Sequence, residues 1–264
     1  MQIEQSFADV NGTRLYYEIA GSEHPLVLIH DFTLDTRMWD AQFEVFAQHY
    51  QVLRYDVRGY GQSALPTSEP YDHSDDLRAL MQHLGVESAH ILGLSMGGRN
   101  AINFALAYPD ATDTLIVVDS GLDGYQGAGE SPLSSIWRTA QQDGIEAAKT
   151  VWLNHPFFET ARENAVVTTQ LAQMVSNYSG WHLVNRDPGI VPTPVAIQRL
   201  DAIHVPTLII IGERDLPDLH GMADTLAQGI PGAKKIVMPD VGHMANMEDP
   251  ERFNEIVLGF LGEL

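Results

Sequence analysis

Serine, histidine and aspartate residues occur in this chain in the order and surroundings that acyl transfer requires. Residues 93–97, with Ser95 at their centre, match the pattern G-x-S-x-G, in which a serine stands on a sharp turn between a strand and a helix. Such a turn needs both Gly93 and Gly97, because a Cβ atom at either position would collide with neighbouring backbone. A serine hydroxyl attacks a carbonyl only when a base removes its proton, so a histidine and an orienting acid should follow Ser95.

Two residues beyond Ser95 fit the roles of base and acid. Asp215 comes shortly after the apolar run 207–211, at a strand end where the active sites of open α/β sheets lie. His243 follows the next predicted strand, 235–238. We therefore predict Ser95 as the nucleophile, His243 as the general base and Asp215 as the acid that orients it. Three other carboxylates are rivals for the orienting acid, with the first ahead of the others: Asp119, Glu213 and Asp218.

Backbone N–H groups are needed to hold the negative charge that develops on the substrate oxygen. The predicted donors are Met96, next to the nucleophile, and Phe32, in the loop after the apolar run 26–29. Each such donor contributes roughly 10²- to 10³-fold to the rate. Asp31 stands beside Phe32, and a carboxylate facing the hole would oppose the developing oxyanion. We expect the Asp31 side chain to point away from it.

Short apolar runs alternate along the chain with segments of helical periodicity. The runs are residues 26–29, 91–94, 114–118, 207–211 and 235–238, and the helical segments are residues 39–49, 75–84, 96–108, 222–228 and 250–264. A hairpin with its turn at Asn11-Gly12 precedes them. This alternation is typical of parallel strands joined by crossover helices, so the chain is predicted to have an α/β fold with an antiparallel edge.

The alternation of apolar runs and helical segments stops between Ser120 and His204, where no segment has the pattern of a buried strand. We predict an α/β core of residues 1–119 and 205–264 and a helical cap, or lid, of residues 120–204. Most aromatic side chains of the cap should pack it onto the core, and some should line a substrate pocket. The candidates for that lining are Trp137, Trp152, His155, Phe158, Trp181 and His182.

Composition excludes several classes of function. The formal net charge of -20, from 15 Lys and Arg against 35 Asp and Glu, disfavours binding to nucleic acid or to an anionic membrane. With no cysteine, the chain has no disulfide, thiolate metal site or cysteine nucleophile. Residues 1–10 lack the basic start and apolar stretch of a signal peptide, and no apolar run would span a bilayer, so a cytoplasmic location is expected.

Several motifs, in this order, resemble the α/β-hydrolase superfamily over essentially the whole chain. They are His30-Asp31-Phe32, residues 56–63 (DVRGYGQS), residues 93–98 (GLSMGG), residues 212–215 (GERD) and Gly242-His243. The resemblance implies a mostly parallel eight-stranded sheet flanked by helices, with the cap inserted after the sixth strand, and a structural role for residues 56–63. The serine elbow is similar to that of 3-oxoadipate enol-lactonases and small carboxylesterases. The departure is Asp31, where members of the superfamily usually carry glycine.

The leading interpretation is a serine hydrolase that cleaves a small carboxylic ester or lactone through an acyl-enzyme, with neither metal nor cofactor. A C–C bond hydrolase of the meta-cleavage type and a cofactor-free lyase or oxygenase are alternatives, and a ligand-binding protein on the same scaffold is disfavoured. Arg99, the cation near the elbow, is either half of a surface ion pair, which we favour, or a partner for a substrate carboxylate. The substrate stays open, and a homodimer is compatible with the sequence.

Overall fold

The structure is a computed structural model that describes residues 3–127 and 133–264. Part of the expected cap, residues 128–132, therefore lies outside the described residues. Within the described ranges, eight strands form one sheet. They are β1 (Glu4–Val10), β2 (Thr13–Ala20), β3 (Pro25–Ile29), β4 (Gln51–Tyr55), β5 (Ala89–Leu94), β6 (Thr112–Val118), β7 (Thr207–Gly212) and β8 (Lys234–Met238).

The sheet is mostly parallel, as predicted. Its strand order is β1-β2-β4-β3-β5-β6-β7-β8, and all neighbours from β4 to β8 pair in parallel. The hairpin of β1 and β2 adds the antiparallel edge, because β2 pairs antiparallel with both β1 and β4. Central strands such as β7, all of whose residues are buried, read as continuous apolar runs because both of their faces are covered.

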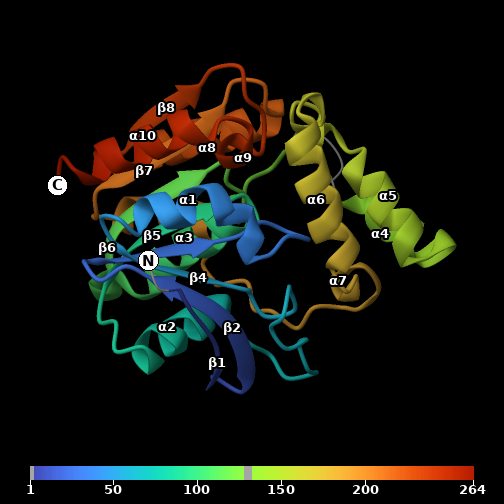
Figure 1. Cartoon of the computed structure of the whole chain (residues 1–264), viewed down its shortest axis with the longest axis horizontal. Coiled ribbons are helices and arrows are strands. Elements are labelled where there is room, and N and C mark those ends of the chain that lie inside the picture. The colour runs from blue at the N-terminus through green and yellow to red at the C-terminus, as the bar shows by residue number, and fades with distance from the viewer. Residues whose placement is uncertain (1–2, 128–132) are drawn as a thin grey trace.

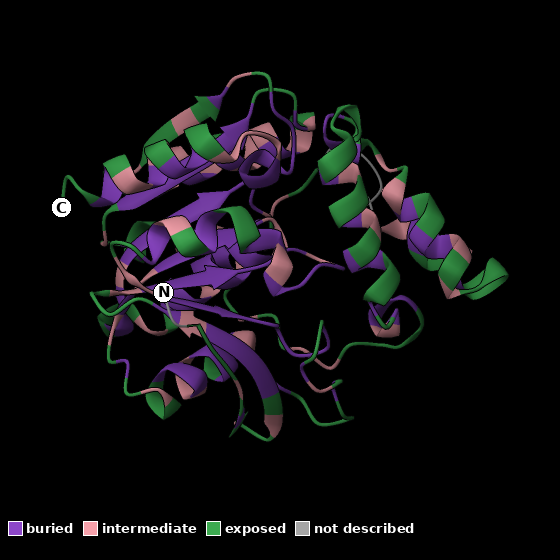
Figure 2. Cartoon of the chain, viewed as in Figure 1, coloured by how far each residue is buried: buried purple, intermediate pink, exposed green. Residues whose placement is uncertain are grey.

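Crossover helices cover the sheet in two groups (Figure 1). Helices α1 (Asp40–Phe46), α9 (Ala245–Glu248) and α10 (Pro250–Leu261) pack together, and so do α2 (His73–His83) and α3 (Met96–Ala107). Helix α8 (Pro217–Gly229) packs on β7 and β8. Figure 2 shows the central strands buried between these helices, whose outer faces are exposed, whereas the edge strands β1 and β8 are largely exposed.

Helix boundaries differ from the expected ones at two places. Helix α8 begins at Pro217 rather than near residue 222, because proline suits the first turn of a helix and the sequence periodicity is weak before Met222. The short helix α9 directly after His243 was not predicted, since four residues are too few for a periodic pattern.

The regular elements described between β6 and β7 are all helices or 3₁₀ turns, and Figure 1 shows this segment standing to one side of the sheet. Residues 119–127 and 185–195 of the segment are not helical. It contains α4 (Ser134–Asp143), α5 (Ile145–Leu153), α6 (Ala165–Asn177) and α7 (Trp181–Val184), with short 3₁₀ turns between and after them. These turns are η3 (Pro156–Phe158), η4 (Ala161–Glu163), η5 (Ala196–Gln198) and η6 (Leu200–Ala202), while η1 (Thr36–Trp39) and η2 (Pro109–Ala111) lie in the core. No helix among the described residues is long and apolar enough to cross a membrane.

Candidate active site

Ser95 stands on the tight turn between β5 and α3. Its backbone has φ 55° and ψ -110°, a conformation that L-residues rarely adopt. The turn needs its glycines, because a Cβ atom on Gly93 would lie 2.1 Å from the carbonyl oxygen of Gly97. A Cβ atom on Gly97 would lie 2.1 Å from the carbonyl oxygen of Ile29. The packing of β3, β5 and α3 therefore holds the serine in a strained position at the wall of a cavity.

His243 and Asp215 form a buried hydrogen-bonded pair. Imidazole Nδ1 lies 2.8 Å from Asp215 Oδ2, and both side chains are about 1% exposed. The other carboxylate oxygen, Oδ1, accepts from the backbone N–H of Leu216 at 2.7 Å, which fixes the orientation of the carboxylate. Among the rival acids, Glu213 is exposed and its Oε2 accepts from the N–H of Asp240. The geometry thus favours Asp215 as the partner of His243.

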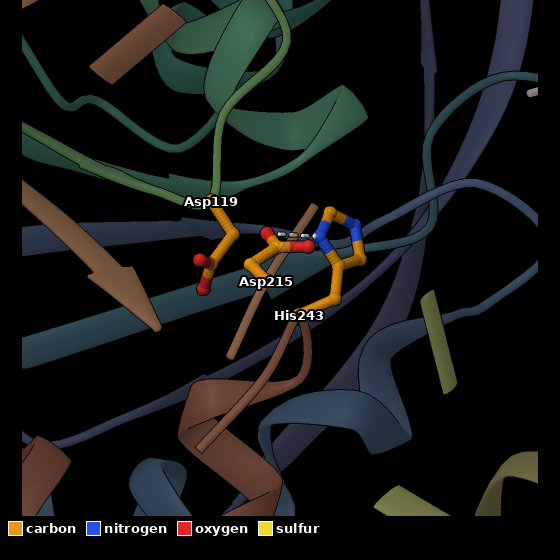
Figure 3. Close-up of side chains that lie close together, drawn as sticks. All are labelled: Asp119, Asp215 and His243. Carbon is orange, nitrogen blue, oxygen red and sulfur yellow. Dashed lines mark hydrogen bonds and ion pairs between the residues drawn. The ribbon is translucent and has the colours of Figure 1, made fainter. Parts of the chain in front are cut away.

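Asp119 lies behind this pair, with the Asp215 carboxylate between it and His243 (Figure 3). Its Oδ1 accepts from the N–H of Gly212 at 2.7 Å, while Oδ2 is buried with no hydrogen-bond partner among the described residues. Burial, together with the negative charge of Asp215, raises the pKa of Asp119 well above its usual range. One ligand atom from each of Asp119, Asp215 and His243 lies within 4.8 Å of the others, a spacing that a metal ion also uses. Because His243 and Asp215 already bond each other, the arrangement serves to orient the imidazole.

The imidazole of His243 lies near several carboxylates, and their charges affect its pKa. Burial lowers its pKa, but the charge and hydrogen bond of Asp215 and the charges of Asp31 and Glu248 outweigh that effect and raise the pKa above its usual value. Phe157 stacks on the ring, with the centroids 4.3 Å apart. Nε2 makes no hydrogen bond within the described part of the chain, and it faces Asp31 Oδ2 at 3.8 Å. The outer nitrogen of His243 is therefore buried, faces Asp31 and is unbonded among the described residues.

Asp31 is where the structure contradicts the sequence analysis. Instead of pointing away, its Oδ1 accepts hydrogen bonds from both predicted oxyanion donors, Phe32 N–H at 2.6 Å and Met96 N–H at 3.2 Å. The side chain is about 2% exposed. The physical reason is that these amides, one of them at the N-terminus of α3, are buried donors that favour an anion. Before a substrate binds there is no oxyanion to repel the Asp31 carboxylate, and the two N–H groups attract it.

A cavity of about 1060 Å³ opens over Ser95. Of the predicted site residues, the following line it: Asp31, Phe32, Ser95, Met96, Arg99, Trp137, Trp152, His155 and His182. The predicted site residues that do not line it are Asp215, His243, Phe158 and Trp181. Phe158 is about 1% exposed and packs edge-on against Trp152, and Trp181 packs edge-on against His182. Both rings therefore support the lining residues from behind.

Among the lining residues that sequence reasoning missed, two are aromatic. Phe157 neighbours Phe158, and the tight turn η3 decides which of the two rings faces the site. Tyr60 belongs to the 56–63 motif, expected to be structural, yet it lines the cavity and stacks on His182 with centroids 4.5 Å apart. An aromatic residue inside a glycine-rich loop was the available signal for Tyr60.

Arg99 also departs from expectation. It lies one helical turn beyond the nucleophile, with its N–H donating to the carbonyl of Ser95, and it lines the cavity. Its guanidinium group makes no ion pair or hydrogen bond to any residue that the structure describes, so the favoured surface ion pair is not found among these residues. Within the described part of the chain, the cavity wall thus carries a cation without a carboxylate partner.

The helical segment holds the loop that carries the oxyanion donors. Trp152 Nε1 donates to Thr33 Oγ1 at 2.8 Å, and the Trp152 ring packs edge-on against Phe32. Thr33 has φ 64°, an unusual conformation for a β-branched residue. The position of the Phe32 N–H therefore depends on contacts made by α5.

Comparisons with known proteins agree with this architecture. A family model described as alpha/beta hydrolase fold matches residues 24–250. The chain is 28% identical to a 2-hydroxy-6-oxononadienedioate/2-hydroxy-6-oxononatrienedioate hydrolase of Paraburkholderia phymatum, over 95% of this chain and 91% of the relative. It is 25% identical to 3-oxoadipate enol-lactonase 1 of Acinetobacter baylyi, over 95% and 94%. The crystal structure of the enol-lactonase from Burkholderia xenovorans LB400 superposes with a TM-score of 0.81 at 27% identity, covering 97% of this chain and 100% of that one.

Proposed function

This chain belongs to the alpha/beta hydrolase fold family, and from that premise we propose that it hydrolyses a small carboxylic ester or lactone through Ser95, His243 and Asp215. The observation that carries the proposal is Ser95, a strained residue on the cavity wall, together with His243, whose Nδ1 is held by a buried carboxylate. Asp31 connects the two, since its Oδ1 accepts from the N–H of Met96 and its Oδ2 lies 3.8 Å from His243 Nε2. Similarity to two enol-lactonases supports the class of substrate.

The proposed reaction is a two-step acyl transfer. Ser95 Oγ attacks the carbonyl carbon while His243 Nε2 accepts the hydroxyl proton, and the N–H groups of Phe32 and Met96 hold the oxyanion. Collapse of the tetrahedral intermediate breaks the bond to the leaving alkoxide, which receives the proton from His243. A water molecule, deprotonated by the same nitrogen, then attacks the acyl-enzyme and releases the acid and free Ser95.

The cavity suggests what the acyl donor carries. Aromatic side chains such as Trp137 and Trp152 form much of its wall, which suits an apolar part of a small molecule. Arg99, which has no ion-pair partner among the described residues, suits a carboxylate at the far end of the substrate from the scissile bond. Esters and lactones that bear both features are the favoured substrates.

Hydrolysis of a C–C bond is a second candidate, supported by the similarity to the Paraburkholderia phymatum hydrolase. The same serine, histidine and oxyanion donors serve either reaction, so the residues alone do not separate them. A vinylogous diketone that carries a carboxylate separates them directly, because only cleavage of its C–C bond yields two smaller products, which chromatography with mass spectrometry detects.

The test is a series of p-nitrophenyl esters from acetate to octanoate, run with the native chain and with Ser95→Ala. A fluorophosphonate label, located by mass spectrometry, identifies the nucleophile independently of turnover. We expect label on Ser95 and loss of ester hydrolysis in Ser95→Ala. A folded protein that is neither labelled nor active, both as the native chain and with the Asp31 carboxylate removed, would contradict the proposal.

A further inference from the structure

The oxyanion hole of this site is already occupied. Its two donors, the N–H groups of Phe32 and Met96, both donate to Asp31 Oδ1. A substrate carbonyl oxygen needs the same two hydrogens, which lie near where its negative charge would develop. Asp31 Oδ1 therefore has to leave the oxyanion hole before the carbonyl oxygen of a substrate can enter it.

The contacts of Asp31 make this occupant hard to displace. Hydrogen bonds to a carboxylate are shorter and stronger than those to a neutral carbonyl, and the 2.6 Å bond from Phe32 fits that description. The second oxygen, Oδ2, faces the imidazole of His243 at 3.8 Å. A neutral ester oxygen competes with an anion that two amides and a histidine stabilise together.

We propose that Asp31 is a specificity-determining residue of this site: its carboxylate is the resting occupant of the oxyanion hole, so only acyl donors whose binding displaces it react at Ser95. The inference rests on the proposed function of Ser95. It goes beyond that function by naming the residue that selects among esters and lactones.

The carboxylate of Asp31 has space to move into when it is displaced from the oxyanion hole. Asp31 lines the cavity, so rotation about its Cα–Cβ bond carries the carboxylate out of the hole into that space. Among the described residues, its carboxylate contacts only the two donors and His243, so no further hydrogen bond has to break. Substrates that fill the cavity gain binding energy for this step, and small esters that touch little of it gain almost none.

The kinetic consequence follows from population shift. If only a fraction of the free enzyme has an empty hole, the apparent dissociation constant of a ligand that needs it rises by the inverse of that fraction. Occupation of the hole by Asp31 thus raises KM and lowers kcat/KM. It changes kcat little, because kcat is measured after the carboxylate has moved. A merely structural Asp31 would lower stability or kcat when replaced and would not make Ser95 more reactive.

The experiment compares Asp31→Gly and Asp31→Asn with the native chain. Glycine empties the hole, and asparagine keeps the side-chain volume and an accepting oxygen but removes the charge, which also keeps the test valid if the glycine variant does not fold. Asp35→Asn is the matched control, because Asp35 lies in the same loop but pairs with Arg37. The readouts are the rate of fluorophosphonate labelling of Ser95, inhibition by butylboronic acid, and kcat and KM for p-nitrophenyl acetate.

We expect labelling of Asp31→Gly to be faster than native by about tenfold or more, with Asp31→Asn between them and Asp35→Asn near native. Butylboronic acid, whose tetrahedral adduct places an oxygen in the hole, should bind more tightly by a similar factor, and KM should fall with kcat nearly constant. Equal or slower labelling of Asp31→Gly, with native Ser95 still labelled, overturns the inference and leaves the proposed function standing. Labelling of neither protein overturns the proposed function and the inference with it.

Discussion

At the scale of single residues, the histidine of this site is unusual for the number of carboxylates around it. His243 is bonded to Asp215, faces Asp31 and lies within the field of Glu248. Each of these charges favours the imidazolium form over the neutral base. The proposed general base is therefore shifted toward the form that already carries a proton.

This environment predicts a shifted pH profile. Because the charges around His243 raise its pKa despite burial, a larger fraction is protonated at a given pH, and the neutral base appears only at higher pH. We expect the acid limb of kcat/KM for ester hydrolysis to have its midpoint above about 6.5, the ordinary value for histidine. In Asp31→Asn the midpoint should move down. A native midpoint below that of the variant would contradict this account of the electrostatics.

Asp119 supplies a second prediction at this scale. Because Asp215 rather than Asp119 bonds His243, and burial raises the pKa of Asp119 well above its usual range, Asp119→Asn should keep kcat/KM within about threefold of native, whereas Asp215→Asn should lose about 10⁴-fold. A raised pKa stabilises the fold below the pKa of the unfolded chain, and this contribution is lost as pH rises through the folded pKa. Thermal unfolding of Asp119→Asn should therefore show a gain in stability over native at alkaline pH. An activity loss comparable to that of Asp215→Asn would identify Asp119 as the working acid.

At the scale of elements, the site depends on how closely β3, β5 and α3 approach one another. The turn that carries Ser95 lies against the carbonyl of Ile29, with no room for a side chain at Gly97. The loop after β3 brings Phe32 and Asp31 to the same place and is fastened to α5 by the bond between Trp152 and Thr33. Three separate stretches of chain thus define one small hole.

Gly97→Ala tests this close approach. The added Cβ would meet backbone that cannot rotate away, so we expect a loss of unfolding free energy of about 3 kcal/mol or more. Gly259→Ala is the matched control, because Gly259 lies inside α10 with nothing within 4 Å of an added Cβ, and it should gain up to about 1 kcal/mol from helix propensity. Urea unfolding of both variants measures the difference. Equal stabilities would mean that the elbow relaxes easily.

At the scale of the whole molecule, the charge of -20 is the dominant feature. Like charges on a compact surface repel one another and weaken the fold, and dissolved salt screens that repulsion. Buried pairs such as Arg54 with Glu18 are screened far less than exposed charges. Added salt therefore weakens the repulsion between exposed like charges more than it weakens the attraction within buried ion pairs.

We expect the Tm at pH 8 to rise when NaCl increases from about 10 mM to about 0.3 M, because the Debye length falls from about 30 Å to below 10 Å. The control is the same titration near the pI of about 4.7, where the net charge is small and the salt effect should disappear. Differential scanning fluorimetry is sufficient for both. A Tm that falls with salt at pH 8 would show that exposed ion pairs outweigh the repulsion.

The sequence by itself determined the architecture. Apolar runs predicted parallel strands covered on both faces, and the resemblance carried by the motifs predicted the mostly parallel eight-stranded sheet and the family membership, which are confirmed. Strand β4 was not among the apolar runs. The chain order Ser95, Asp215, His243 placed the three residues at strand ends that meet at one edge of the sheet, and the bond between His243 and Asp215 fits that prediction. Their catalytic roles stay predictions.

Only the tertiary structure decided which way side chains face. The Asp31 carboxylate turns into the hole, Arg99 stays unpaired, and Phe157 rather than Phe158 meets the cavity. These outcomes depend on amides, charges and rings that other elements bring within a few ångströms, and local periodicity carries no information about them. A pattern of residues identifies the strand end at which a group lies, whereas the surrounding packing selects its rotamer and hence its chemistry.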